Sequence, residues 1–280
     1  MRYDAHPRYG GNLQRFSWPQ FLFRSCAGWI LISISIFFII SSWMSGDIFF
    51  TNPKALISLG AQDPVKLVQG EYWRFLTPML LHGGLIHFLF NAYAISYVGR
   101  DLEPVLGSKY FLLIFVLSGF AGSISSAVFS TVLSVGASGA IFGLLGAGLY
   151  IEYAVAKLIK TSTGVKPKVG PYMMLLLINI PLSFLPMIDS SAHFGGLLSG
   201  FMLTYILTKM RPSRLNKQNK IVGSMVLILY TAILSFGFML GTDRSFVKER
   251  LLLKYKEETH VPQQIILLNQ IMELDSDEVE

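Results

Sequence analysis

Long apolar runs constrain the fold of this chain more than any other feature of its sequence. Six runs have roughly the ~17–25 residues that an α-helix needs to cross a lipid bilayer. They cover residues 26–44, 110–128, 137–155, 171–187, 192–207 and 221–240. A seventh run, 84–98, contains polar residues and is the weakest of the set by hydropathy. We therefore predict an all-α, polytopic membrane helix bundle with seven spans.

The composition and the placement of charge agree with a membrane protein. Of the 280 residues, 52% are hydrophobic and 14% charged, and the mean hydropathy of +0.51 excludes an ordinary soluble domain. The net charge of +6 does not indicate a nucleic-acid partner, because Lys and Arg are sorted by side. With the N-terminus inside, 15 of the 23 fall on the cytoplasmic side, and five of the other eight lie in the C-terminal tail. The positive-inside rule then predicts a multi-pass cell-membrane protein with a cytoplasmic N-terminus and an extracytoplasmic C-terminus.

The chain divides into four regions on these grounds. In order they are a cytoplasmic tail (1–24), a core of six spans (25–210) with a long first outer loop (45–83), a basic linker with the seventh span (211–240) and an extracytoplasmic tail (241–280). The first outer loop mixes apolar clusters with Trp, Tyr and Arg, which favours the membrane interface. The basic residues of the linker are a topology signal or a contact with anionic lipid. In the tail, 245–257 and 263–274 have helical spacing and would pack on the outer surface or on a partner.

The first span carries the only cysteine, Cys26, which has no partner for an intramolecular disulfide. The span follows about 25 polar residues, and both this segment and the apolar run are too long for a typical secretory signal. We therefore predict an uncleaved membrane anchor.

Four polar side chains fall at one depth of the predicted bundle. The second, fourth and sixth spans all run from outside to inside, so their first turns lie at the same outer level. His87 and Asn91 open the second span, Ser138 opens the fourth and His193 opens the sixth. Taken singly, each is more often a packing or interface residue than a functional one. Their common depth favours a site, because polar groups inside spans are costly and need a reason to be there.

Small residues give two of these helices faces that can approach closely, although such spacing often marks plain helix contacts. One stripe holds Gly139, Gly143 and Gly146, and the other holds His193, Gly196 and Gly200. Packing of the stripes brings Ser138 toward His193, with the Phe142 ring available to lie against the imidazole. Gly136 serves the turn before the serine helix. On the second span, His87 and Asn91 point the same way and are suitable donors for an oxyanion.

These motifs resemble those of the rhomboid family of intramembrane serine proteases. The matching stretches lie within residues 20–210 and are Trp73-Arg74, His82 to Asn91, Gly136-Ala137-Ser138-Gly139, and Ala192-His193-Phe194-Gly195-Gly196 with Gly200. The resemblance implies a six-helix core plus a seventh C-terminal transmembrane helix, of the bacterial type. It also implies hydrolysis of peptide bonds in single-span or polytopic membrane proteins within the lipid bilayer, with no metal or cofactor.

The resemblance assigns roles to the four residues at one depth. It implies that Ser138 is the nucleophile and His193 the general base, and that His87, Asn91 and the Ser138 backbone N–H hold the oxyanion. Asp189 lies four residues before His193, where its side chain can point elsewhere. We therefore predict a Ser–His dyad that works through an acyl-enzyme, rather than a triad with a carboxylate.

Other matching residues have supporting roles by the same resemblance. His82 lines the cavity, and Arg74 and Glu103 are structural. Phe142 stands where the family often has Tyr, so its ring can stack but has no hydroxyl to donate. Glu152 and Asn179 have no predicted partner at matching depth, and we expect them to be structural.

Two functions from other classes remain as alternatives. A non-catalytic relative that binds client spans should lack the serine or the histidine, and this chain has both. A small-molecule transporter is expected to contain an inverted repeat or paired broken helices, and the sequence has neither pattern. The sequence leaves the physiological substrate and the oligomeric state open.

Overall fold

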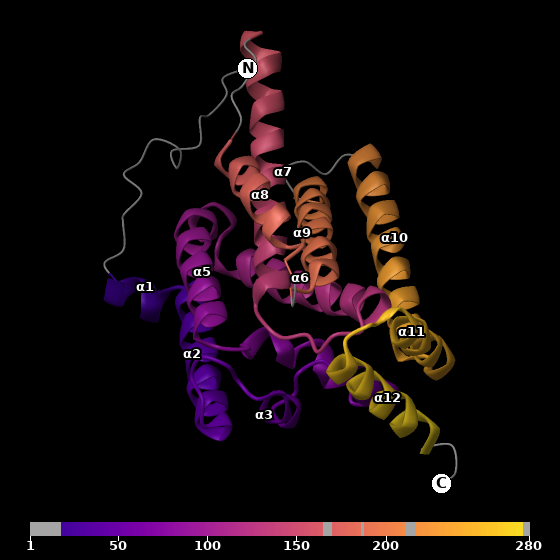
Figure 1. The fold of residues 1–280 in the computed structure, drawn as a ribbon. Coiled ribbons are helices and arrows are strands. Elements are labelled where there is room, and N and C mark those ends of the chain that lie inside the picture. Colours follow the sequence, from indigo (N-terminus) through magenta and orange to yellow (C-terminus); the bar gives the residue numbers. More distant parts are fainter. Residues whose placement is uncertain (1–17, 165–169, 186–187, 211–216, 277–280) are drawn as a thin grey trace.

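The computed structural model describes residues 18–164, 170–185, 188–210 and 217–276. These residues form a bundle of helices (Figure 1), and within them β-structure is limited to an isolated bridge between Gln62 and Ser134. The helices in chain order are α1 (Trp18–Arg24), α2 (Cys26–Ser45), α3 (Pro53–Ser58), α4 (Pro64–Val68), η1 (Tyr72–Phe75), η2 (Thr77–Leu80), α5 (Leu85–Leu106), α6 (Ser108–Phe129), α7 (Ser138–Thr163), α8 (Pro171–Leu182), α9 (Ser190–Lys209), α10 (Lys217–Thr242), α11 (Arg244–Glu257) and α12 (Val261–Ser276). The predicted all-α fold class is confirmed.

All seven predicted spans correspond to helices in the described residues. Four are long and apolar enough to cross a membrane by length and composition: α2, α6, α7 and the part of α10 from Gln218. α5 has 22 residues and runs past its predicted end at 98, because its polar side chains there have partners. For example, Asp101 accepts a hydrogen bond from the Tyr172 hydroxyl at 2.6 Å. α8 has only 12 residues and ends at Leu182, before the predicted end of its span at 187. Ser183 is the C-cap residue of this helix.

Glu103 fixes the junction between α1 and α2. Its carboxylate accepts the N–H groups of Cys26 (2.9 Å) and Ala27 (3.0 Å) and the hydroxyl of Ser108 (2.6 Å). A carboxylate at this position satisfies amides that have no acceptor within the helix. The last residues of the predicted cytoplasmic tail form α1, and Phe21 of this helix is buried in the core. Residues 1–17 of that tail lie outside the described residues.

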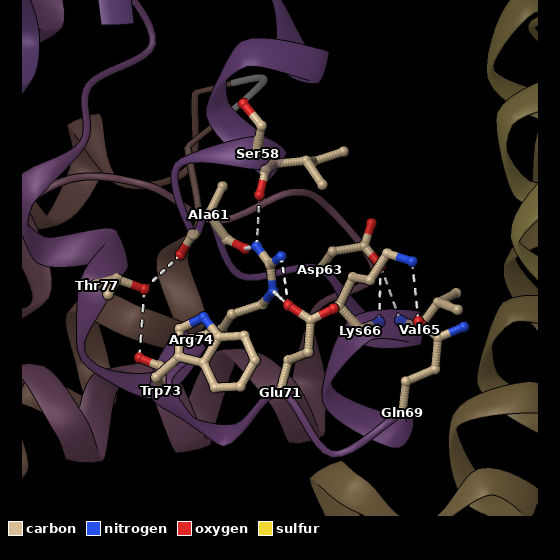
Figure 2. A network of polar contacts seen from close by, with 12 residues as sticks. Ser58, Ala61, Asp63, Val65, Lys66, Gln69, Glu71, Trp73, Arg74 and Thr77 are labelled. Atoms are coloured by element: carbon tan, nitrogen blue, oxygen red, sulfur yellow. Dashed lines mark hydrogen bonds and ion pairs between the residues drawn. The ribbon is translucent and has the colours of Figure 1, made fainter. Parts of the chain in front are cut away.

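Residues 45–83, predicted to be the first outer loop, fold around a buried arginine. Figure 2 shows the Arg74 guanidinium at the centre of a polar network, where it donates to the carbonyls of Ile57 (2.7 Å) and Ala61 (2.8 Å) and pairs with Glu71. The Thr77 hydroxyl closes the same loop by donating to the Gly60 carbonyl at 2.6 Å. The buried guanidinium and the two carbonyls that it contacts are thus paired, which holds the short helices α3, α4, η1 and η2 of this loop together.

The two predicted tail helices pack on the chain's own first outer loop. Val65 of α4 joins an apolar cluster with residues of α11 and α12. These residues are Val247, Leu251, Leu267, Ile271 and Leu274. Lys66 adds an ion pair with Glu273 at 2.8 Å. The sequence left open whether these two helices pack on the protein itself or on a partner. In the structure they pack on the protein itself.

The centre of the bundle is formed by α6, α7 and α9, with α2 and α5 on one side and α10 on the other (Figure 1). Glycine makes these contacts close. A Cβ on Gly122 of α6 would stand 2.7 Å from the Ala192 carbonyl oxygen of α9. This crossing positions the first turns of α7 and α9 against each other, and the polar residues singled out by the sequence lie there.

Candidate active site

Ser138 and His193 face each other across the crossing of α7 and α9. Ser138 is the first residue of α7, and His193 lies in the first turn of α9. The Ser138 Oγ atom is 2.8 Å from His193 Nε2. The imidazole is 8% exposed, whereas the serine is half-buried, so the pair is shielded from bulk solvent without being sealed.

Backbone contact between glycines sets this approach. A Cβ on Gly196 would stand 2.0 Å from the Gly139 carbonyl oxygen, and a Cβ on Gly200 would stand 1.8 Å from that of Gly143. Both distances are far inside van der Waals contact, so a side chain at either position would push α9 away from α7. The two glycine stripes therefore meet, with one turn of helix between successive contacts.

Phe142 holds the imidazole from one side. Its ring stacks on that of His193, with centroids 4.2 Å apart and planes inclined by 10°. Phe142 is itself buried in the core, so the ring has little freedom to turn away. Stacking and burial together fix the plane in which His193 can point its nitrogens.

The other ring nitrogen of His193 has a partner that the sequence analysis did not single out. Ser183 Oγ, at the end of α8, lies 2.8 Å from His193 Nδ1. Asp189 caps α9, where its Oδ1 accepts the Ala192 N–H at 3.2 Å and the Ser191 hydroxyl, and it makes no hydrogen bond to the imidazole among the described residues. The groups in contact with the two ring nitrogens of His193 are thus both hydroxyls.

Gly136 brings the segment before α7 against His87. Its φ of +117° lies in the left-handed region that favours glycine. A Cβ there would stand 2.6 Å from His87 Nε2 and 3.7 Å from Ser138 Oγ. The Gly136 N–H donates to the Pro78 carbonyl at 2.9 Å, which ties this turn to η2. His87, Gly136 and Ser138 therefore converge on one point.

Asn91 and His82 both contact His87. The Asn91 side chain is buried, and its Nδ2 donates one hydrogen to the His87 carbonyl at 2.9 Å. Among the described residues its Oδ1 has no hydrogen-bond partner. His82 is fully buried and meets the His87 ring edge-on, with centroids 5.2 Å apart. Burial, together with the nearby His87, lowers the pKa of His82 to about 3, so its imidazole is neutral at physiological pH.

The start of α7 can receive negative charge. The helix begins at Ser138 without a side-chain cap. The first amides of a helix lack acceptors within the helix and carry the positive end of its dipole. With His87 beside the serine, the arrangement can stabilise an anionic oxygen on an atom bound to Ser138 Oγ. Among the described residues, no group of three or more His, Cys, Asp or Glu is arranged to hold a metal ion.

Comparison with known proteins places this site in a family. A family model described as a rhomboid domain matches residues 69–210, which is 142 of the 280 residues and includes Ser138, His193, His87 and Asn91. The chain belongs to the rhomboid family. A putative rhomboid protease of Bacillus subtilis (strain 168), YdcA, is 36% identical over 151 residues, which cover 53% of this chain and 73% of that relative. With its apolar helices, this rhomboid is a multi-pass membrane protein.

Two longer relatives are also similar to this chain. The rhomboid protease GluP of Bacillus subtilis (strain 168) is 38% identical over 190 residues, 68% of this chain and 35% of GluP. RHOMBOID-like protein 6, mitochondrial, of Arabidopsis thaliana is 43% identical over 157 residues, 54% of this chain and 49% of that relative. The chain therefore spans between about a third and a half of the length of these two curated relatives.

Proposed function

We propose that this rhomboid is an intramembrane serine endopeptidase that hydrolyses peptide bonds in or near the transmembrane segments of membrane proteins. The observation that carries the proposal is the 2.8 Å contact between Ser138 Oγ and His193 Nε2. The names of two relatives, GluP and YdcA, include the words rhomboid protease and support the same activity.

The proposed chemistry uses a Ser–His dyad. His193 accepts the hydroxyl proton of Ser138 as Oγ attacks the peptide carbonyl, and the resulting tetrahedral intermediate collapses as His193 returns that proton to the leaving amine. Water then attacks the acyl-enzyme with His193 again as base, which releases the acid product and restores Ser138. Because Phe142 stacks on the imidazole at 4.2 Å, the base is already oriented before substrate arrives.

The proposed oxyanion site combines the Ser138 backbone N–H with the side chains of His87 and Asn91. The uncapped start of α7 supports the backbone donor. The close approach of His87 to Gly136 supports the second donor. Asn91 uses one amide hydrogen on the His87 carbonyl, which leaves its other hydrogen for the oxyanion. Removing a single donor of this kind costs on the order of 10²–10³ in turnover.

The position of the dyad along α7 and α9 indicates where in the membrane a substrate would be cleaved. Ser138 and His193 lie at the ends of α7 and α9 rather than at their middles, which supports a site near one membrane surface where water is close. The sorting of Lys and Arg supports a cytoplasmic N-terminus, which makes this surface the outer one. A substrate helix has to unwind locally there, because its hydrogen-bonded backbone otherwise hides the scissile carbonyl.

A client-binding protein without catalysis is the second candidate function, and it does not need this geometry. Binding of a client span requires neither a serine–imidazole contact nor a ring stacked on the imidazole. Both features are present here, and both are what a nucleophile and its base require.

Cleavage of a single-span test protein in proteoliposomes tests the proposal. Ser138→Ala and His193→Ala should each abolish cleavage, and both variants should keep the unfolding temperature of the wild type. Ser41→Ala is the matched control, since Ser41 is a fully buried serine on α2 whose hydroxyl donates to its own helix at Phe38. Cleavage by Ser138→Ala at the wild-type rate would show that the dyad is not the catalytic apparatus.

A further inference from the structure

Ser183 touches the catalytic base of the proposed dyad from the side opposite Ser138. We propose that Ser183 is a positioning residue that holds His193 in the tautomer with hydrogen on Nδ1. This inference rests on the proposed function, because a tautomer matters only if His193 Nε2 acts as a base. It adds a residue of α8 to a site otherwise built from α5, α7 and α9.

The hydrogen bonds around Ser183 fix the direction of proton donation. Its hydroxyl donates to the Asn179 carbonyl at 2.9 Å, and a carbonyl oxygen can only accept. A serine has a single hydroxyl hydrogen, and with that hydrogen on the Asn179 carbonyl Ser183 Oγ accepts in its 2.8 Å contact with His193 Nδ1. Nδ1 therefore carries the hydrogen of the neutral imidazole, and Nε2 presents its lone pair to Ser138.

Ser183 is buried, although its neighbours in the chain are exposed. It is 1% exposed, whereas its neighbours Leu182 and Phe184 are 48% and 68% exposed. Within α8 the buried side chains are those of Tyr172 and Leu176, far from the end that carries Ser183. The contact with His193 is thus the polar tie of the C-terminal end of α8 to the bundle.

Ser183 takes the position that a carboxylate occupies in a triad. The Asp189 Oδ1 atom caps the first turn of α9 and does not contact Nδ1 of His193. The result is an uncharged chain of hydrogen bonds that runs from Ser138 through His193 and Ser183 to the Asn179 carbonyl, in which each bond polarises the next. When His193 takes up a proton from Ser138, Nδ1–H keeps an acceptor, so no buried donor is left unpaired at that step.

Kinetics of Ser183 variants provide the first test. Ser183→Ala should lower kcat about ten-fold with KM nearly unchanged, because one neutral hydrogen bond to the base is lost. Ser183→Thr, which keeps the hydroxyl, should recover most of the rate, and Ser41→Ala should match the wild type. A kcat of Ser183→Ala equal to that of the wild type would overturn the inference.

The tautomer itself can be observed by ¹⁵N NMR of protein labelled in its histidines. The His193 signals, assigned by their loss in His193→Gln, should show a protonated Nδ1 in the wild type and a mixture of tautomers in Ser183→Ala. Identical His193 signals in the two proteins would overturn the inference even if kcat fell, since a merely structural role does not change the tautomer. If instead Ser138→Ala retained cleavage, the proposed function would fail, whatever the Ser183 variants do.

Discussion

His193 lies between two regions that are packed in opposite ways. Toward α7 the backbones of the two helices are in direct contact. The Gly139 and Gly143 carbonyls of α7 occupy the space that side chains at positions 196 and 200 of α9 would need. Toward α8 the contact is sparse, with two buried side chains in the helix and polar ties at its two ends. The rigid crossing sets the distance between the proposed nucleophile, Ser138, and its proposed base, His193. The loosely packed helix supplies a hydrogen-bond acceptor, a role that tolerates more movement.

The largest effect should follow from a side chain in the rigid crossing. Gly200→Ala places a Cβ 1.8 Å from the Gly143 carbonyl oxygen, so α9 must shift by about an ångström or more. A misplacement of about 1 Å costs on the order of 100-fold in turnover. Cleavage should fall by about that factor, and the unfolding temperature should drop.

Gly223→Ala on α10 is the matched control for that variant. Its Cβ would first meet the Met210 Cγ atom at 3.1 Å, which belongs to an exposed, flexible side chain that can give way. Its cleavage rate should stay close to that of the wild type. Equal loss in the two variants would mean that glycine content, rather than the α7–α9 crossing, is what the enzyme needs.

An intermediate effect is expected from the ring that stacks on His193. Phe142→Ala removes a contact with the imidazole at 4.2 Å, and aromatic pairs of this kind contribute about 0.5–1.5 kcal/mol. We expect kcat to fall up to about ten-fold, measured with saturating substrate. Phe142→Tyr keeps the ring and should retain most activity; a loss as deep as that of Phe142→Ala would mean that the stacked ring is not what matters.

A smaller effect is expected at the far end of α8. Glu152 accepts the N–H groups of Tyr172 (2.7 Å) and Met173 (3.2 Å), and so caps this helix. Glu152→Gln weakens both bonds and should lower the unfolding temperature by a few degrees, with a cleavage rate within a few-fold of the wild type. A loss comparable to that of Gly200→Ala would contradict the assignment of α8 to the tolerant side.

The smallest effect should come from the ion pair between Lys66 of α4 and Glu273 of α12. Lys66→Ala should cost less than about 1 kcal/mol of stability, because both side chains are partly exposed. The hydrogen bond that Lys66 donates to Glu273 raises the pKa of Lys66 above its ordinary 10.5. A group with a raised pKa stabilises the fold below its unfolded pKa, so this contribution is present at neutral pH and is lost in titrations above about pH 10.5. Unfolding curves at neutral and high pH test this.

Much of the rigid crossing is predictable from the sequence because it depends on residues close together in the chain. The apolar runs predict the helices, and the glycines four apart predict which faces of α7 and α9 meet. Gly136 is predictable as a turn before the serine helix, and the structure gives it a positive φ. These features need only helical periodicity and the alternation of span direction, which places the first turns of every second span at one depth.

The sparse side of the site is not predictable in the same way. Ser183 is a hydroxyl in an apolar run, and nothing in its spacing from His193 distinguishes it from other serines of the chain. Its contact depends on where α8 ends and how α9 returns. Glu152 likewise has no partner predicted from the sequence, and its partners in the structure are backbone N–H groups at the start of α8. The packing of α11 and α12 on α4 joins residues about two hundred positions apart, such as Lys66 and Glu273, which no local pattern indicates.

The most direct measurement is the site of covalent labelling by a fluorophosphonate in detergent or proteoliposomes, read by mass spectrometry of the digested protein. The phosphonyl adduct should be found on Ser138 in the wild type and in Ser41→Ala, and labelling should be lost in Ser138→Ala and in His193→Ala. An adduct on another serine, or undiminished labelling without His193, would contradict the assignment of Ser138 as a nucleophile activated by His193.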